Sequence, residues 1–111
     1  MAVLTSHTLN GSDGTHAGGI PVTLTKLATG GRVFAAAMDG GGRLSQTVAP
    51  TQIDPEATYE LVFNLAGYWA ARNVKARVNQ VALRFTMPDP DGAYHMPVII
   101  NPNSYSIWSS S

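Results

Sequence analysis

The chain has 111 residues, a length that suits a single domain over residues 1–111 and leaves no room for a second hydrophobic core of useful size. Seven basic residues balance seven acidic residues and only 13% of the chain is charged, so the composition argues against a nucleic-acid partner or an anionic membrane surface. The absence of cysteine excludes disulfides and thiolate metal sites, and without an apolar stretch of about 18 residues or a signal peptide at MAVLTSHTLNG we expect a cytoplasmic protein with no membrane span.

The chain begins with a predicted strand, VLTSHTL at residues 3–9, and continues with segments in which apolar and polar residues alternate. Such alternation predicts strands with one buried face, and it occurs at residues 20–27, 58–65 and 80–87. Runs rich in glycine, proline, asparagine and aspartate predict tight turns between the strands: NGSDG, TGG, DGGG, PDPDG and NPNS. Many short strands joined by such turns favour an all-β antiparallel sandwich or barrel.

Two segments depart from this alternating pattern. GYWAARN at residues 67–73 predicts one short helix between strands. AYHMPVII at residues 93–100 is apolar on both faces, whereas a strand of a small sandwich needs only one apolar face. A second apolar face predicts a subunit interface or a surface that contacts a ligand.

The chain contains three histidines, which fall in different predicted environments. His16 lies in the glycine-rich run GSDGTHAGG, where we expect an exposed side chain without a special role. His7 lies in the middle of the first strand, on the same face as Thr5 and Leu9. His95 lies in the strand with two apolar faces. Taken alone, each of these histidines is compatible with a structural role.

Arg43 follows three glycines, so we expect its guanidinium at a tight turn where a strand begins. Other chemistries lack support, because there is no cysteine or G-x-S-x-G motif, no complete set of zinc ligands, and no lysine and helix after DGGGR to form a P-loop. What remains is a site without a metal or cofactor, in which an imidazole moves protons and a guanidinium stabilises negative charge. This combination suits the attack of water on an electron-poor carbonyl of a small molecule.

Five segments spread over the chain match a known family pattern. They are LTSHTLN (4–10), GGIPVTLTKL (18–27), MDGGGRL (38–44), YELVFNLAGYWAARNV (59–74) and DPDGAYHMPVIINPNSYS (89–106). The last is the most specific, because Tyr94-His95-x-Pro97 is followed by an Asn-Pro turn, as in the family's Tyr-His-Val-Pro signature. Through these segments the chain resembles the 5-hydroxyisourate hydrolase and transthyretin family almost from end to end.

The resemblance implies a transthyretin-like (prealbumin-like) β-sandwich of eight antiparallel strands with one short helix. It also implies a homotetramer with active sites at the subunit interface, which would account for the two apolar faces of residues 93–100. The implied activity is the hydrolysis of 5-hydroxyisourate, whose ring opens during urate breakdown. The family's catalytic residues correspond to His7, Arg43 and His95, and the resemblance leaves open which histidine is the base. Tyr94 is expected to contact the substrate.

The C-terminal segment departs from the family pattern. Family hydrolases end in Tyr-Arg-Gly-Ser, whereas this chain ends in Trp108-Ser109-Ser110-Ser111, of which we expect Trp108 and Ser111 to contact the substrate. The loss of a positive charge and the gain of an indole suit a larger, less anionic ligand. Three functions therefore stay open: a 5-hydroxyisourate hydrolase, a relative that uses the same His-Arg-His core on another small heterocycle as a biosynthetic hydrolase or cyclase, and a non-catalytic ligand-binding protein.

Overall fold

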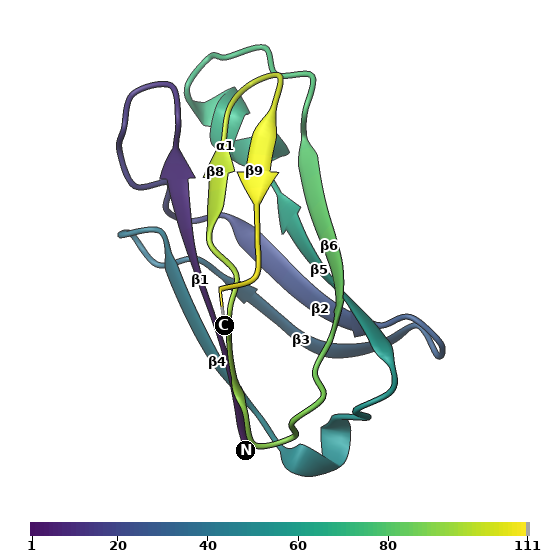
Figure 1. Cartoon of the computed structure of the whole chain (residues 1–111). Coiled ribbons are helices and arrows are strands. Elements are labelled where there is room, and N and C mark those ends of the chain that lie inside the picture. Colours follow the sequence, from purple (N-terminus) through teal and green to yellow (C-terminus); the bar gives the residue numbers. More distant parts are fainter. Residues whose placement is uncertain (111) are drawn as a thin grey trace.

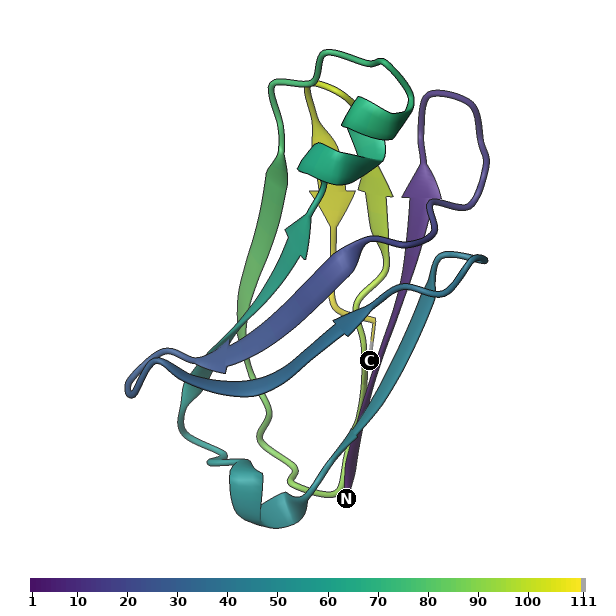
Figure 2. The same ribbon diagram turned by 180° about the vertical axis from the view of Figure 1, so that it is seen from behind.

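The structure, a computed structural model, describes residues 1–110 and is a sandwich of two β-sheets (Figures 1 and 2). In chain order the strands are β1 (Ala2–Asn10), β2 (Pro21–Lys26), β3 (Gly31–Ala37), β4 (Arg43–Val48), β5 (Thr58–Asn64), β6 (Gln80–Thr86), β7 (Ala93–His95), β8 (Val98–Ile100) and β9 (Tyr105–Ile107). A short 3-10 helix, η1 (Pro50–Gln52), follows β4, and the predicted short α-helix, α1 (Ala66–Ala71), follows β5. Neither helix in residues 1–110 is long and apolar enough to cross a membrane. The all-β prediction with one short α-helix is confirmed.

The two sheets differ in how their strands are connected. One has the order β4-β1-β8-β9, with β7 also paired to β1, and the other has the order β3-β2-β5-β6. The pairs of β1 with β7 and β8 are parallel, and the other pairs are antiparallel. Figure 1 shows β1 running from the end of the molecule that holds the N-terminus and η1 to the end that holds α1. In its sheet, β1 lies between β4 on one edge and β7 and β8 on the other.

Strands β7 and β8 are two halves of one strand that is interrupted at Met96 and Pro97. Both halves keep one register on β1, because the offset between paired residues is the same before and after the gap. Proline has no N–H to give to a ladder, whereas the neighbouring Met96 N–H still donates to the Thr5 carbonyl oxygen at 2.9 Å. When the two halves are counted together, the described strands correspond to the eight that the family resemblance implied.

The hydrophobic core lies between the sheets and contains the alternate residues that the sequence predicted to be buried. Its largest fully buried side chains are Tyr59, Phe63, Leu4, Ile20, Leu24, Leu61, Leu65, Met87, Met96, Ile100, Val22 and Val81. In the interrupted strand, Met96, Val98 and Ile100 face this core, whereas the residues between them are half-buried on the opposite face. One apolar face of residues 93–100 is thus a core face, and the other points outward.

Strand β1 places polar side chains toward the core as well as apolar ones. The buried Ser6 hydroxyl donates to the Met96 carbonyl oxygen at 2.6 Å, and the buried Asn10 amide donates to the Tyr68 hydroxyl at 3.1 Å. These hydrogen bonds satisfy polar groups that would otherwise be costly to bury. Because successive residues of a strand point to opposite faces, His7 lies on the outward face of the sheet.

Candidate active site

The turn before β4 fixes the backbone of Arg43. The Asp39 carboxylate oxygen Oδ1 accepts hydrogen bonds from the backbone N–H groups of Gly41 and Arg43, both at 2.9 Å. Gly42 has φ +73°, and a Cβ added to it would lie 2.6 Å from the Thr8 carbonyl oxygen. The Gly42 carbonyl in turn accepts a hydrogen bond from the Thr8 N–H at 2.7 Å. Glycine is required at this position both for its backbone conformation and for its close approach to β1.

The strand register brings the three predicted catalytic residues to one outward face. His7 of β1 pairs directly with Arg43 of β4. Thr5, two residues earlier on the same face of β1, pairs with His95 of β7. Because adjacent strands lie about 4.8 Å apart, side chains at these positions are neighbours on the sheet surface. The pairing joins residues that are far apart in the sequence.

A pocket of about 450 Å³ opens on this face. Its lining residues are Thr5, Ser6, Asp39, Arg43, Leu44, Ser45 and His95. Within it, the Thr5 hydroxyl oxygen lies 2.8 Å from His95 Nδ1, which leaves Nε2 as the ring nitrogen that remains for a water molecule or a ligand. The pocket therefore combines a permanent cation with an imidazole of fixed orientation. Among residues 1–110, no group of three or more histidine, aspartate or glutamate side chains could hold a metal ion.

His7 lies beside Arg43 and has a second imidazole as a neighbour. Its Nε2 atom is 2.8 Å from Nδ1 of His16, and the two ring planes are inclined by 25°. Burial is the largest cause that lowers the pKa of His7 from its ordinary value, and the charge of Arg43 is the next. Charges on His16 and His95 lower this pKa further, whereas backbone hydrogen bonding at Gly41 raises it. The net lowering favours the neutral form of His7 at neutral pH.

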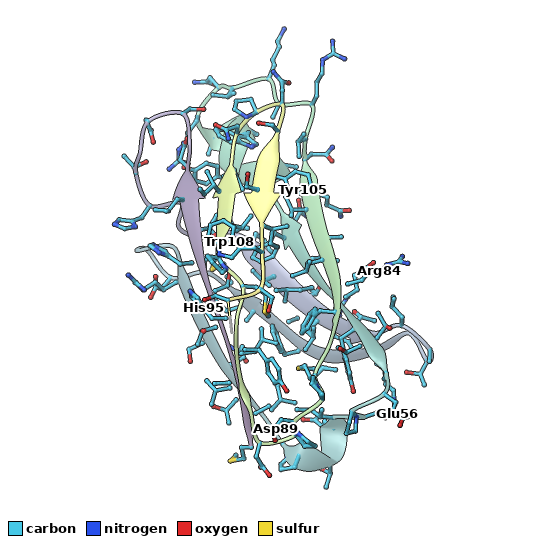
Figure 3. All side chains as sticks on the ribbon, viewed as in Figure 1. Glu56, Arg84, Asp89, His95, Tyr105 and Trp108 are labelled. Atoms are coloured by element: carbon cyan, nitrogen blue, oxygen red, sulfur yellow. The ribbon has the colours of Figure 1, made fainter. Side chains whose placement is uncertain are left out.

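The segment after β9 carries Trp108 to the same outward face. Ile107 pairs with Val98, whose side chain faces the core, so the next residue along the strand faces outward. The Trp108 N–H donates to the Pro97 carbonyl oxygen at 3.4 Å, which continues the pairing beyond β9. Trp108 is 45% exposed, and the bridge between Ser110 and His95 keeps this segment beside β7 (Figure 3). The indole is thus available to a ligand on the face that carries the pocket.

The other two predicted substrate contacts are placed differently. Tyr94 packs against the core, and its hydroxyl donates to the Asp89 carbonyl oxygen and accepts from the Asp89 N–H, both at 2.8 Å. This side chain closes the turn before β7 and does not join the residues of the outward face. Ser111 lies outside the residues that the structure describes.

Comparison with known protein families adds a match that spans most of the chain. A model of the HIUase/Transthyretin family matches residues 4–109. The chain belongs to this family. Its membership confirms the resemblance that the sequence segments indicated.

Individual members of the HIUase/Transthyretin family agree with this assignment. A 5-hydroxyisourate hydrolase from Pseudomonas aeruginosa is 33% identical, over 100% of this chain and 93% of its own length. The structure of Klebsiella pneumoniae 5-hydroxyisourate hydrolase has a TM-score of 0.84 at 24% identity and covers 100% of both chains. Sea bream transthyretin in complex with thyroxine has a TM-score of 0.83 at 21% identity, covering 96% of this chain and 93% of its own. These structural likenesses confirm the transthyretin-like fold.

Sequence reasoning missed the contact that His16 makes. The side chain is exposed, as expected, but it is hydrogen-bonded to His7 rather than free of any role at the site. The run NGSDG folds the chain back on β1, so that Leu9 pairs with His16. A hairpin-like return after the first strand was the signal available in the sequence, because it would place residues near position 16 beside that strand.

The lowered pKa of His7 predicts a specific titration. In the folded protein, an NMR titration should show His7 half-protonated at a pH below the ordinary histidine value of about 6.5, whether its ring signals change in one step or in more. The unfolded chain binds this proton at a higher pH than the folded chain does, so this residue lowers stability as the pH falls below about 6.5. A midpoint at or above the ordinary value would contradict the environment described for His7.

Proposed function

We propose that the chain is a single-domain 5-hydroxyisourate hydrolase that opens the ring of its substrate by attack of water on a carbonyl group. The observation that supports this most is the shared outward face, on which Arg43 and His95 line one pocket and His7 pairs with Arg43. Relatives of similar length carry this activity in their names, including the hydrolase of Pseudomonas aeruginosa. A face that only binds a ligand has no need of two histidines beside an arginine.

Arg43 is proposed to bind the carbonyl oxygen that becomes negatively charged. When water adds to the carbonyl carbon, the electron pair of the C=O bond moves onto oxygen, and a guanidinium can donate hydrogen bonds to that charge. The carboxylate of Asp39 accepts a hydrogen bond from the Arg43 backbone N–H at 2.9 Å. The guanidinium therefore extends from a turn whose backbone position is fixed. A preorganised cation stabilises the transition state more than the neutral ground state.

His95 is proposed to move the proton. Its Nε2 would accept a proton from the attacking water and return it to the ring nitrogen that leaves when the C–N bond breaks. Thr5 supports both stages, because its hydroxyl is 2.8 Å from His95 Nδ1 and 3.5 Å from the Tyr94 carbonyl oxygen. A hydroxyl can accept a hydrogen bond from Nδ1–H or donate one to bare Nδ1. Thr5 can therefore pair with either neutral tautomer of His95.

The direct test of this function uses freshly prepared 5-hydroxyisourate. Its ultraviolet absorbance should fall faster with nanomolar protein than in buffer alone, and the initial rate should be proportional to protein concentration. A panel of other small cyclic amides and imides, assayed in parallel, tests the second candidate function. Faster turnover of a panel member than of 5-hydroxyisourate, or binding without turnover of any of them, would contradict the proposal.

Trp108 is the feature that favours the second candidate, a different heterocyclic substrate. An indole on the outward face can stack on a planar ring, and base–aromatic stacking contributes about 1–3 kcal/mol. Because this indole is 45% exposed, we expect the lower part of that range. Trp108→Ala should raise KM about tenfold and change kcat much less, whereas Trp108→Phe should stay within about threefold of the wild type. An unchanged KM in Trp108→Ala would exclude a substrate contact.

We also propose that the protein is cytoplasmic and that it assembles as a homotetramer. The pocket face carries apolar side chains that are only partly covered, with Val3 36% exposed and Trp108 45% exposed. Contact between copies of the chain across this face would cover these side chains and enclose the pocket. The lack of cysteine is compatible with the reducing cytoplasm. Light scattering with size-exclusion chromatography should give four times the mass of one chain, and a monomer would contradict the assembly.

A further inference from the structure

We propose that His16 is a positioning residue of the active site, which holds the His7 ring by a ring-to-ring hydrogen bond so that the two imidazoles bind one proton between them. The geometric part of this inference stands on the structure alone, and its kinetic part rests on the proposed hydrolase function. The central observation is the distance of 2.8 Å between His7 Nε2 and His16 Nδ1.

The backbone on both sides of His16 is hydrogen-bonded to β1. Ala17 donates its N–H to the Thr8 carbonyl oxygen at 2.9 Å, and Asn10 donates its N–H to the Thr15 carbonyl oxygen at 2.8 Å. Between these two bonds, Leu9 and His16 form an antiparallel bridge. A side chain on such a bridge has a defined direction, in contrast to one at the tip of a mobile loop.

The segment containing His16 lies on the same edge of β1 as β4. Strand β8 occupies one edge of β1 at residues 8–10, so the bridge to His16 must use the other edge, where β4 pairs with residues 2–7. His7 pairs with Arg43 and Leu9 with His16 along this edge. His16 is consequently the diagonal neighbour of His7 and follows Arg43 along the edge of the sheet.

The contact between the two imidazoles is a hydrogen bond between ring edges. The ring centroids are 4.9 Å apart and the planes differ by 25°. This centroid separation is close to the sum of the nitrogen–nitrogen distance and the two ring radii, so the rings meet through their nitrogens. One nitrogen must carry the proton and the other must present its lone pair, since two bare nitrogens or two N–H groups would repel. The bond thus makes the tautomer of one ring depend on that of the other, and it holds the orientation of the His7 ring.

The hydrogen bond to His16 should change how His7 is protonated. Adding one proton to the neutral pair keeps a hydrogen bond at the contact and makes it charge-assisted, which is the stronger form. Adding a second proton removes the acceptor and places two positive charges together. The other charged or titratable groups facing His7 are Arg43 on β4 and His95 on β7, and both act against its protonation. We therefore expect His7 to be protonated in two separate steps.

Substitutions of His16 separate positioning from a passive surface role. His16→Asn keeps a hydrogen-bonding group near the position of Nδ1 but cannot titrate, and His16→Ala removes both properties. Because His16 is exposed, neither change should prevent folding. Ser12→Ala, in the same loop and exposed, is the matched control. The chain has only three histidines, so all ring signals can be followed in one NMR titration of the full-length protein.

The expected result has a substrate-free part and a kinetic part. Without substrate, His7 should titrate in two steps in the wild type and in Ser12→Ala, and in one step in both His16 variants. With 5-hydroxyisourate, His16→Ala should lower kcat/KM about three- to tenfold at neutral pH, the loss expected for one hydrogen bond. His16→Asn should return kcat/KM to within about twofold of the wild type.

Two results would overturn the inference. The first is a one-step titration of His7 in the wild type that stays the same in both His16 variants. The second is an active enzyme whose kcat/KM and pH profile do not change in His16→Ala. A wild-type protein that shows the two-step titration but does not turn over 5-hydroxyisourate would refute the proposed function and leave the shared proton established.

Discussion

Replacement of Arg43 by alanine should lower kcat/KM for 5-hydroxyisourate by about a hundred- to a thousandfold, the loss typical of removing one group that stabilises an oxyanion. The loss should fall mainly on kcat if the guanidinium acts on charge that develops in the transition state. The Arg43 side chain is exposed and its backbone is anchored by Asp39, so the fold should survive the change. Steady-state kinetics, with circular dichroism to verify folding, measures this effect.

Two further arginine substitutions make the Arg43 experiment specific. Arg43→Lys keeps the positive charge but loses the planar set of donors, so we expect it to recover only part of the rate. Arg32→Ala removes another exposed arginine, from β3 in the other sheet, and should leave the kinetics unchanged. If Arg43→Ala retained the wild-type rate, the guanidinium would have no role in the chemistry.

Replacement of Gly42 by alanine should destabilise the fold by about 2–5 kcal/mol. A residue with a side chain pays about 1–2 kcal/mol for the left-handed backbone conformation, which Gly42 adopts with φ +73°. Overpacking adds about 1–3 kcal/mol, because the new Cβ would lie 2.6 Å from the Thr8 carbonyl oxygen. Denaturant unfolding measures the free energy, and a fall in Tm of roughly 10 °C or more should accompany it.

The same turn contains a matched control. Gly40 has no positive φ, and a Cβ added there would meet no atom within 4 Å. Gly40→Ala should therefore change stability by less than about 0.5 kcal/mol. Because Gly42 immediately precedes Arg43, activity in Gly42→Ala should fall as well, even at a temperature where the variant is folded. Equal stability of the two variants would mean that the turn is not constrained as the structure indicates.

Much of the fold could be predicted from the sequence because its strands alternate cleanly. The buried residues of β2 and β5 follow the two-residue period, and the helix appears where the alternation stops. A strand with two apolar faces at residues 93–100 was also identifiable, but its interruption at Met96 and Pro97 was not predicted. These features are local, and local patterns are readable from one sequence.

The arrangement of the site depends on long-range pairing that no local pattern contains. Thr5 was expected on the face of His7, but its hydrogen bond to His95 follows from the parallel register of β1 with β7. The link between His7 and His16 depends in the same way on where the chain returns to β1. Tyr94 is the exception, because the two-residue alternation alone places it on the face opposite His95, where its hydroxyl donates a hydrogen bond to the Asp89 carbonyl oxygen.

We propose that hydrolysis takes place on the outward face of the sheet containing β1, and the rate of His95→Ala tests this claim. The initial rate of 5-hydroxyisourate loss should be measured for the wild type and for folded His95→Ala at equal protein concentration. We expect acceleration over buffer by the wild type and a loss of about a hundredfold or more in His95→Ala, because the variant lacks its proton-transfer group. Equal rates for the two proteins, or no acceleration by the wild type, would contradict the claim.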